Sequence, residues 1–224
     1  VSGPLKRLLH PDDRIPNSRD RYYLMKYDVA TGLSERLTYG SHNVYLNDIS
    51  PDGKKLLCST SKPDITRCPF SLSSLFEIDL TTLQADTLVA WDAYLGSASY
   101  SPDGKQLLVT GSPSAFGGIG KNCGEHPIAN DFDTQAFIMD LATKKVQAIT
   151  RDFNPTVSPV QWNRVDGCIY FDTTDGDCRH IYRYVPKTGG FEMLPLEEDV
   201  ITSFTLADDN PVVAAYVGGG NTST

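Results

Sequence analysis

Short apolar runs separated by turn residues follow one another along this 224-residue chain. The runs are rich in β-branched and aromatic residues, and Gly, Pro, Asp and Asn bound them, which is typical of β-strands. No stretch carries a helical period of useful length. The pattern predicts strands at Tyr22–Asp28, Val44–Ile49, Lys55–Thr60, Leu75–Leu80, Ser97–Ser101, Gln106–Gly111, Gln135–Leu141, Pro159–Asn163, Cys168–Thr173, His180–Val185, Ile201–Leu206 and Val212–Val217. Weaker outer strands are predicted at Glu35–Thr38, Asp86–Val89, Val146–Thr150 and Phe191–Leu194.

One phrase occurs twice between predicted strands, as SPDGKKLLCST from Ser50 and as SPDGKQLLVTG from Ser101. Ser, Pro, Asp and Gly suit the four positions of a type I turn, because Pro presets φ and Gly tolerates a positive φ. Each phrase therefore predicts a hairpin tip. A repeated phrase also indicates one structural unit used several times.

A second anchor is a Thr in the turn that follows another strand. It occurs at Thr31, Thr82, Thr143 and Thr188, and the tip acid recurs at Asp52, Asp103, Asp166 and Asp209. The distance from each Thr to the next tip Asp is 21, 21, 23 and 21 residues, whereas the distance from tip Asp to the next Thr is 30, 40 and 22. The stretch from Thr to the next tip Asp is therefore nearly constant in length. The insertions lie in the stretch from tip Asp to the next Thr.

The two anchors define a unit of four antiparallel strands, here named A to D. The SPDG tip joins A to B, and the Thr turn joins C to D. Such units, forty to sixty residues long, are typical of β-propeller blades. The predicted fold is all-β, a propeller fragment of about four blades in one domain, residues 1–224. Its repeats cover roughly residues 22–43, 44–94, 95–156, 157–199 and 200–224.

The predicted chain begins with a C–D pair and ends with an A–B pair, so its strand edges are open. Open edges and half-covered apolar faces favour association. The two pairs could form one composite blade and close a four-bladed ring. The other possibilities are an edge-to-edge dimer and an open arc, and the sequence does not choose among them.

Composition and charge narrow the class of protein. A net charge of −8 and a pI of about 4.9 argue against a nucleic-acid surface. No run of eighteen apolar residues is present, so no membrane span is predicted. Because the chain starts at Val1, we expect the natural N-terminus to lie upstream. Of the five cysteines, Cys58 with Cys68 and Cys168 with Cys178 could each form a disulfide, and inert free thiols are the alternative.

The sequence predicts no catalytic residue, cofactor or metal site. It holds no G-x-S-x-G nucleophile elbow, and its four histidines lie far apart. The glycine-rich segment 117–122 departs from a P-loop, since Ala115 stands at the first Gly and Asn122 at the Ser/Thr that binds magnesium. Cys123 stands where a dinucleotide fingerprint has its third Gly. The segment is interpreted as a flexible loop.

The longest insertion, residues 111–134, joins strand B to strand C of the middle repeat. On a propeller it would emerge on the face that carries the blade-to-blade connections. Long loops without regular structure are often functional, and a tolerated surface excursion is the equal alternative. The residues predicted to face a substrate or a neighbouring domain are Phe116, Lys121, Asn122, Glu125 and His126.

Several segments together resemble one family. The SPDGK tips, the turns YDVATG and MDLATK, and the segments FGGIGKN, TRDFNPTVS and EEDVITSFTLADDNPV resemble the N-terminal propeller of bacterial prolyl oligopeptidase-family serine peptidases. The similarity is to the dipeptidyl-peptidase-like members of Bacteroides-type bacteria and covers nearly the whole chain. SPDGK tips alone are weakly specific, because TolB-type propellers share them.

The resemblance implies a propeller that screens access to a C-terminal α/β-hydrolase domain, which is missing here. The implied parent is a serine peptidase of short peptides that is periplasmic or otherwise exported, and this chain alone would be inactive. Glu197 and Glu198 do not sit in the motif with which dipeptidyl peptidases hold a substrate amino terminus, so no binding residue is carried over. The alternative is a TolB-like protein-binding propeller with no hydrolase. A propeller enzyme with a loop-built active site is a third hypothesis, which lacks the converging carboxylates it needs.

Overall fold

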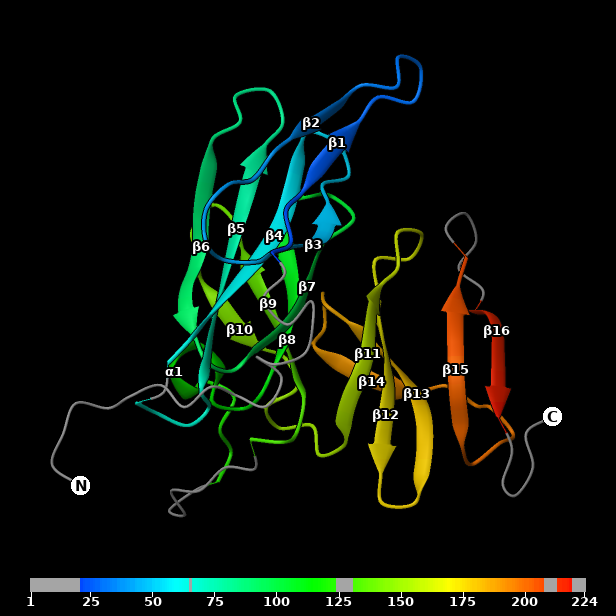
Figure 1. Cartoon of the computed structure of the whole chain (residues 1–224). Coiled ribbons are helices and arrows are strands. Elements are labelled where there is room, and N and C mark those ends of the chain that lie inside the picture. The colour runs from blue at the N-terminus through cyan, green and yellow to red at the C-terminus, as the bar shows by residue number, and fades with distance from the viewer. Residues whose placement is uncertain (1–20, 65, 124–130, 208–212, 219–224) are drawn as a thin grey trace, which may run out of the picture. The chain divides into compact units, whose positions relative to one another are not determined.

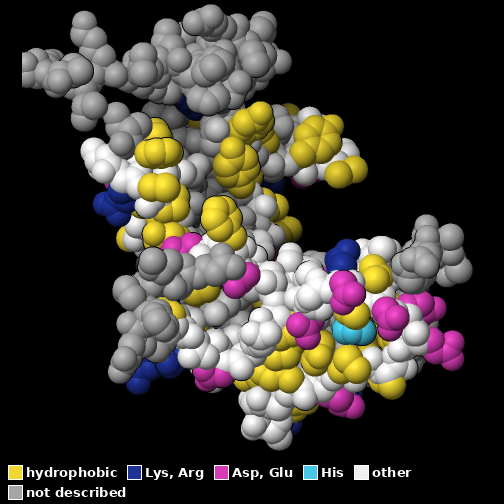
Figure 2. Space-filling view, turned by 90° about the horizontal axis from the view of Figure 1, so that it is seen from below, with side chains coloured by type: hydrophobic (Ala, Val, Ile, Leu, Met, Phe, Trp, Pro, Cys, Tyr) yellow, Lys and Arg dark blue, Asp and Glu magenta, His cyan; other side chains and the backbone are white. Residues whose placement is uncertain are grey.

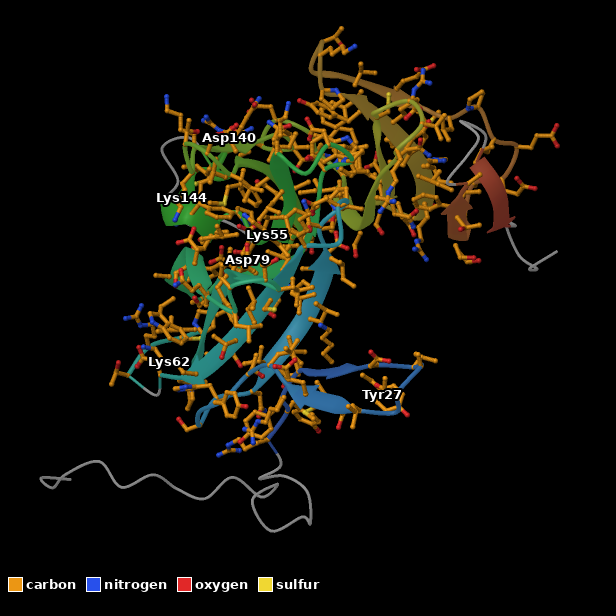
Figure 3. All side chains as sticks on the ribbon, turned by 90° about the horizontal axis from the view of Figure 1, so that it is seen from above. Tyr27, Lys55, Lys62, Asp79, Asp140 and Lys144 are labelled. Carbon is orange, nitrogen blue, oxygen red and sulfur yellow. The ribbon has the colours of Figure 1, made fainter. Side chains whose placement is uncertain are left out.

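The computed structural model describes residues 21–64, 66–123, 131–207 and 213–218. The chain divides into two compact units, residues 1–45 and 46–224. In the first unit, β1 (Met25–Tyr27) pairs antiparallel with β2 (Ser34–Arg36), and Figure 3 labels Tyr27 on this hairpin. The guanidinium of Arg36 lies 3.4 Å from the ring centroid of Tyr23, and this cation–π contact packs the hairpin against the chain beside it.

The remaining strands form three four-stranded antiparallel sheets and a two-stranded one, each built from consecutive strands (Figure 1). The first sheet contains β3 (Val44–Ile49), β4 (Lys55–Pro63), β5 (Ser71–Asp79) and β6 (Ala85–Asp92). The second contains β7 (Leu95–Tyr100), β8 (Gln106–Gly111), β9 (Gln135–Asp140) and β10 (Val146–Ala148). The third contains β11 (Thr156–Trp162), β12 (Ile169–Asp175), β13 (Cys178–Val185) and β14 (Gly190–Met193). The last hairpin is β15 (Ile201–Leu206) with β16 (Val213–Gly218).

The all-β prediction and the repeated four-strand unit are confirmed in this propeller-like fragment, whereas the blade count and ring closure stay predictions. Some bounds were wrong. β5 begins at Ser71 rather than Leu75, because the four residues before Leu75, three of them serines, also pair with β4. The segment 117–122, interpreted as a flexible loop, overlaps the end of a four-residue helical turn, α1 (Ala115–Gly118). Its residue Phe116 has a φ of 54°, a left-handed conformation that apolar periodicity does not reveal.

The repeated SPDG phrase forms the predicted hairpin tip in both copies. Gly53 donates its backbone N–H to the carbonyl of Ser50 at 2.8 Å and has a φ of 71°. The Ser50 hydroxyl donates to Asp52 at 2.7 Å and accepts from the backbone of Lys55 at 2.9 Å. The tip at Ser101 repeats each of these bonds. The serine and aspartate therefore satisfy the polar groups of the turn by themselves.

The tip at Asp166 is one residue longer than the tips at Ser50 and Ser101. Its backbone bond runs from Gly167 to Asn163, four positions back instead of three, and the amide of Asn163 replaces the serine hydroxyl. Asp166 still accepts the backbone N–H of Cys168 at 2.8 Å. The fourth predicted tip, at Asp209, lies outside the described residues.

The C–D turns share another hydrogen-bond arrangement, in which an aspartate at the end of strand C accepts backbone N–H groups of the turn. Asp79 accepts from Thr81 and Thr82, both at 2.8 Å, and Asp140 accepts from Thr143 at 2.7 Å. Figure 3 labels Asp79 on the first sheet and Asp140 on the second. The residue after each repeated Thr has a positive φ, and these residues are Gly32 (71°), Leu83 (56°), Lys144 (56°) and Gly189 (71°).

Three apolar clusters join neighbouring sheets of the second unit. Leu57 and Leu75 of the first sheet pack with Val109 and Phe137 of the second. On the other face of the second sheet, a cluster joins it to the third sheet, and its members include Leu108, Ile138, Ile169 and Phe171. The third cluster joins the third sheet to β15 through Tyr170, Ile181, Ile201 and Phe204. The second and third sheets are therefore buried on both faces.

Polar bonds reinforce the boundary between the first two sheets. Tyr100 of β7 donates its hydroxyl to Glu77 at 2.7 Å, and Lys55 pairs with the other oxygen of that carboxylate at 2.9 Å. The backbone N–H of Tyr100 donates to Asp48 of β3 at 2.7 Å. Burial, followed by the bond to Glu77, raises the pKa of Tyr100. At the C–D turn, Lys144 donates to the carbonyl of Thr87 at 2.9 Å.

We expect Leu83→Gly to stabilise the fold. An L-residue in the left-handed region is strained, and half of the Leu83 side chain is exposed, so its removal costs little packing. The free energy of unfolding should rise by about 0.5–1 kcal/mol, measured by urea denaturation. Leu83→Ala is the matched control, because alanine keeps the Cβ and the strain. A glycine variant no more stable than the alanine variant would contradict the explanation.

The turn aspartates predict a loss of stability in acid. Hydrogen bonds lower the pKa of Asp28, Asp52, Asp79, Asp103 and Asp140, with the bonds from Thr31, Ser50, Thr82, Ser101 and Thr143 as the main causes. A carboxyl whose folded pKa is depressed adds stability above its unfolded pKa of about 3.9 and loses it as the pH falls further. The unfolding free energy should therefore drop between about pH 5 and pH 2.5. In Asp140→Asn the drop should be smaller, and an unchanged drop would refute the assignment.

Candidate functional site

The B–C loops and the D–A connections lie at the same end of the second unit, as the sequence predicted for the insertion. The insertion contacts the D–A connections on both sides of its own sheet. The backbone N–H of Phe116 donates to Asp92 at 2.7 Å, at the start of the connection from β6 to β7. The amide of Asn122 donates to Asp152 at 3.0 Å, in the connection from β10 to β11. Two distant hydrogen bonds therefore fix the described part of the insertion.

Gly120 is the tightest point of the insertion. The amide nitrogen of Gln135, the first residue of β9, donates to the Gly120 carbonyl at 3.0 Å. A Cβ built on Gly120 would lie 2.2 Å from Oε1 of Gln135 and 3.1 Å from the backbone of Pro113. Only glycine fits this approach of two chain segments without displacement of either one.

The larger cavity at this end has a volume of about 700 Å³. Three sheets contribute to its wall. The B–C loop of the first sheet supplies Cys68 and Pro69, and the third sheet supplies Ser158. The second sheet supplies the remaining residues, which are Ala93, Tyr94, Leu95, Gly96, Thr110, Gly111, Ser112, Asp131, Phe132, Asp133 and Thr134. Most residues of the wall are apolar or small, and two of them, Asp131 and Asp133, carry carboxylates.

A second cavity of about 290 Å³ adjoins the same loop, and Asp133 lines both cavities. Its wall is polar and is formed by Pro113, Gly120, Asn122, Cys123, Asp133, Gln135, Arg151, Asp152, Phe153 and Asn154. Figure 2 views the molecule from below in Figure 1, and apolar and acidic side chains lie beside one another in that view.

The two carboxylates of the larger cavity are only partly engaged within the described part of the chain. Asp133 accepts the hydroxyl of Thr156 on Oδ1 at 3.0 Å, and Asp131 accepts the hydroxyl of Ser112 on Oδ1 at 3.3 Å. Asp92 differs, because both of its oxygens accept backbone N–H groups, from Tyr94 and from Phe116. Asp92 therefore holds the loops together, whereas the second oxygens of Asp131 and Asp133 accept no hydrogen bond from the described residues.

The residues predicted from sequence to face a ligand occupy different environments. The Phe116 ring packs against Phe137 at 5.2 Å and joins the apolar cluster, while Lys121 is exposed. Asn122 lines the polar cavity. Glu125 and His126 lie outside the described residues. A ligand-facing role for these five residues stays a prediction.

Asp131, Phe132 and Asp133 border the larger cavity, and they are not among the residues predicted from the sequence to face a ligand. Phe132 is 98% exposed, an unusual position for a large aromatic ring. The sequence feature that could have identified them is the tripeptide Asp-Phe-Asp shortly before strand C, at the end of the insertion. An aromatic residue between two acids in a loop is typical of a binding surface rather than of a core.

The described residues contain no group of three His, Cys, Asp or Glu side chains placed to hold a metal ion. All five cysteines are free thiols, so neither possible disulfide is formed. Burial raises the pKa of Cys58 to about 12, which keeps this thiol protonated and inert at neutral pH.

Comparison with known proteins supports the fold and leaves the family open. No protein-family model and no curated protein matches the sequence. Among solved structures, TolB from Acinetobacter baumannii is similar with a TM-score of 0.57 and 20% identity over 88% of this chain and 45% of that one. An oligogalacturonate lyase in complex with manganese has a TM-score of 0.65 and 15% identity over 89% and 54%. Dipeptidyl peptidase 4 from Porphyromonas gingivalis has a TM-score of 0.57 and 10% identity over 83% and 31%.

At these identities the likeness shows the fold alone, and the chain spans about a third to a half of each of these structures. The neighbours include TolB-like propellers and peptidases of the prolyl oligopeptidase family, so the fold is consistent with both functions proposed from the sequence. Among the described residues, no helix is long and apolar enough to cross a membrane.

We expect Gly120→Ala to release the insertion from its sheet. The new methyl group would displace Gln135 or Pro113, and overpacking of this kind costs about 1–3 kcal/mol. Thermal unfolding and limited proteolysis within residues 111–134 would measure the effect. Gly190→Ala is the matched control, because its Cβ would meet only Thr188 at 3.4 Å. Equal protease resistance in the two variants would contradict the role assigned to Gly120.

Proposed function

We propose that this chain is the propeller part of a longer, exported peptide-hydrolysing protein, and that its B–C loop end binds short peptides on their way to a separate hydrolase domain. The observation that carries the proposal is the cavity of about 700 Å³ between three sheets. Pockets of 300–1,000 Å³ with an apolar wall and a few polar groups are typical of small-ligand sites. The sequence itself contains no G-x-S-x-G nucleophile motif, so bond cleavage is assigned to another part of the protein.

The cavity wall suits an extended peptide better than a folded partner. Tyr94, Leu95 and Phe132 offer apolar surface to a side chain, and Asp131 and Asp133 offer acceptors to backbone or side-chain N–H groups. Because loops from separate sheets build the wall, the rigid sheets fix its shape. A recess of about 700 Å³ has room for a short extended segment of peptide.

The alternative function is a TolB-like module that binds a folded protein partner. The similarity to TolB is a likeness of fold, and it supports this alternative no more than the likeness to dipeptidyl peptidase 4 supports the first. The two functions differ in their ligands, because only the first requires short unstructured peptides to bind in the recess.

The test is peptide binding by the purified 224-residue chain. We expect unstructured peptides of four to eight residues to bind with a Kd of about 10 μM to 1 mM, measured by calorimetry. Phe132→Ala should weaken binding by about 5- to 10-fold, since loss of a buried aromatic contact costs about 1 kcal/mol or more. The chain alone should release no chromophore from chromogenic dipeptides.

Met193→Ala is the matched control, because Met193 is an exposed apolar residue of β14 that lines neither cavity. It should bind peptides as the unchanged chain does. Absence of peptide binding by the folded chain would refute the proposed function, as would cleavage of dipeptides that serine-directed inhibitors block.

A further inference from the structure

We propose that the two adjoining cavities select peptides in which an apolar residue stands next to a lysine or arginine. This inference rests on the proposed function and specifies its ligand. The apolar side chain would occupy the larger cavity, and the basic side chain would reach the polar cavity beside it. The two recesses have Asp133 in common, so neighbouring residues of one peptide can enter both.

The larger cavity determines the apolar part of the preference. Pro69, Tyr94, Leu95 and Phe132 contribute apolar surface to its wall, and Gly96 of β7 also lines it. A Cβ on Gly96 would lie 2.7 Å from the hydroxyl oxygen of Thr110, so this position is closed to larger residues. An aliphatic or aromatic side chain gains about 25 cal/mol for each Å² that it buries against such a wall.

The charges around the two cavities determine the basic part. The described charged residues that line them are three carboxylates, Asp131, Asp133 and Asp152, and one guanidinium, Arg151. Asp152 is partly occupied by the amide of Asn122, and Arg151 is exposed. A cationic side chain therefore meets an excess of negative charge, whereas an acidic side chain would be repelled.

Asp133 is the residue on which the selection depends most. Its Oδ1 accepts the hydroxyl of Thr156, which fixes the carboxylate, and its Oδ2 carries no hydrogen bond within the described part of the chain. It is half-buried, so a bond to a guanidinium or ammonium is less screened there than on the open surface. Charge-assisted bonds of this kind are stronger than neutral ones.

The test compares three capped tetrapeptides with the 224-residue chain, acetyl-Gly-Phe-X-Gly-amide with X as lysine, norleucine or glutamate. Capping removes the terminal charges, so only the side chain X differs. We expect the lysine peptide to bind about 5- to 10-fold tighter than the norleucine peptide, and the glutamate peptide to bind more weakly than both. The preference for lysine should shrink as salt rises from about 0.05 M to 0.5 M.

The variant Asp133→Asn tests whether the preference for lysine depends on Asp133 itself or on the negative charge of the chain as a whole. The asparagine oxygen can still accept the Thr156 hydroxyl, so the loop should stay in place, while the preference for lysine should fall to about 2-fold or less. Asp177→Asn, which removes the same charge from the turn between β12 and β13, is the matched control and should keep the full preference.

The other possible results distinguish failure of the charge selection from failure of the proposed function. If the lysine and norleucine peptides bind equally, the charge selection is refuted while the proposed peptide-binding function stands. If lysine is preferred and Asp133→Asn does not change the preference, the site is misplaced and the inference is refuted. If none of the three peptides binds and longer uncapped peptides also fail, the proposed function itself is refuted.

Discussion

The packing of neighbouring sheets against one another is the constraint on which the rest of this structure depends. In the second sheet, Val109 faces the first sheet, and Leu108, the residue before it, faces the third. Successive residues of a strand point to opposite faces, so a sheet buried on both sides needs unbroken apolar runs rather than alternation. The middle strands meet this demand, whereas the outer strand β10 has only three residues and no fully buried one.

How much of the fold could be predicted from the sequence depended on how far apart along the chain the interacting residues lie. The tips at Ser50 and Ser101 were predictable because each closes its own hydrogen bonds within six residues. The left-handed turn at Phe116 was not predictable, because its backbone N–H bonds to Asp92, which is 24 residues away in the sequence. The cavity residue Asp133 escaped prediction for a similar reason, since its partner Thr156 belongs to the third sheet.

The described part of the insertion acts as a wall rather than as a loose loop. Its bonds to Asp92 and Asp152 attach it to the connections before and after its own sheet, and Gly120 presses it against the first residue of β9. A segment tied at such separate points keeps its shape without regular secondary structure. Under the proposed function such a wall would favour binding, because a preformed recess spares a ligand the entropic cost of ordering it.

The two ends of the second unit use their charged groups differently. At the end with the SPDG tips and the Thr turns, Glu77 is buried and bonds both to Tyr100 and to Lys55, and the turn aspartates accept backbone N–H groups. These carboxylates are committed to holding the sheets and turns. At the opposite end Asp131 and Asp133 each have one oxygen engaged and lie beside an open recess. The turn aspartates accept N–H groups of their own turns, whereas Asp131 and Asp133 border a recess that a ligand could enter. This difference in surroundings favours the loop end for the proposed binding.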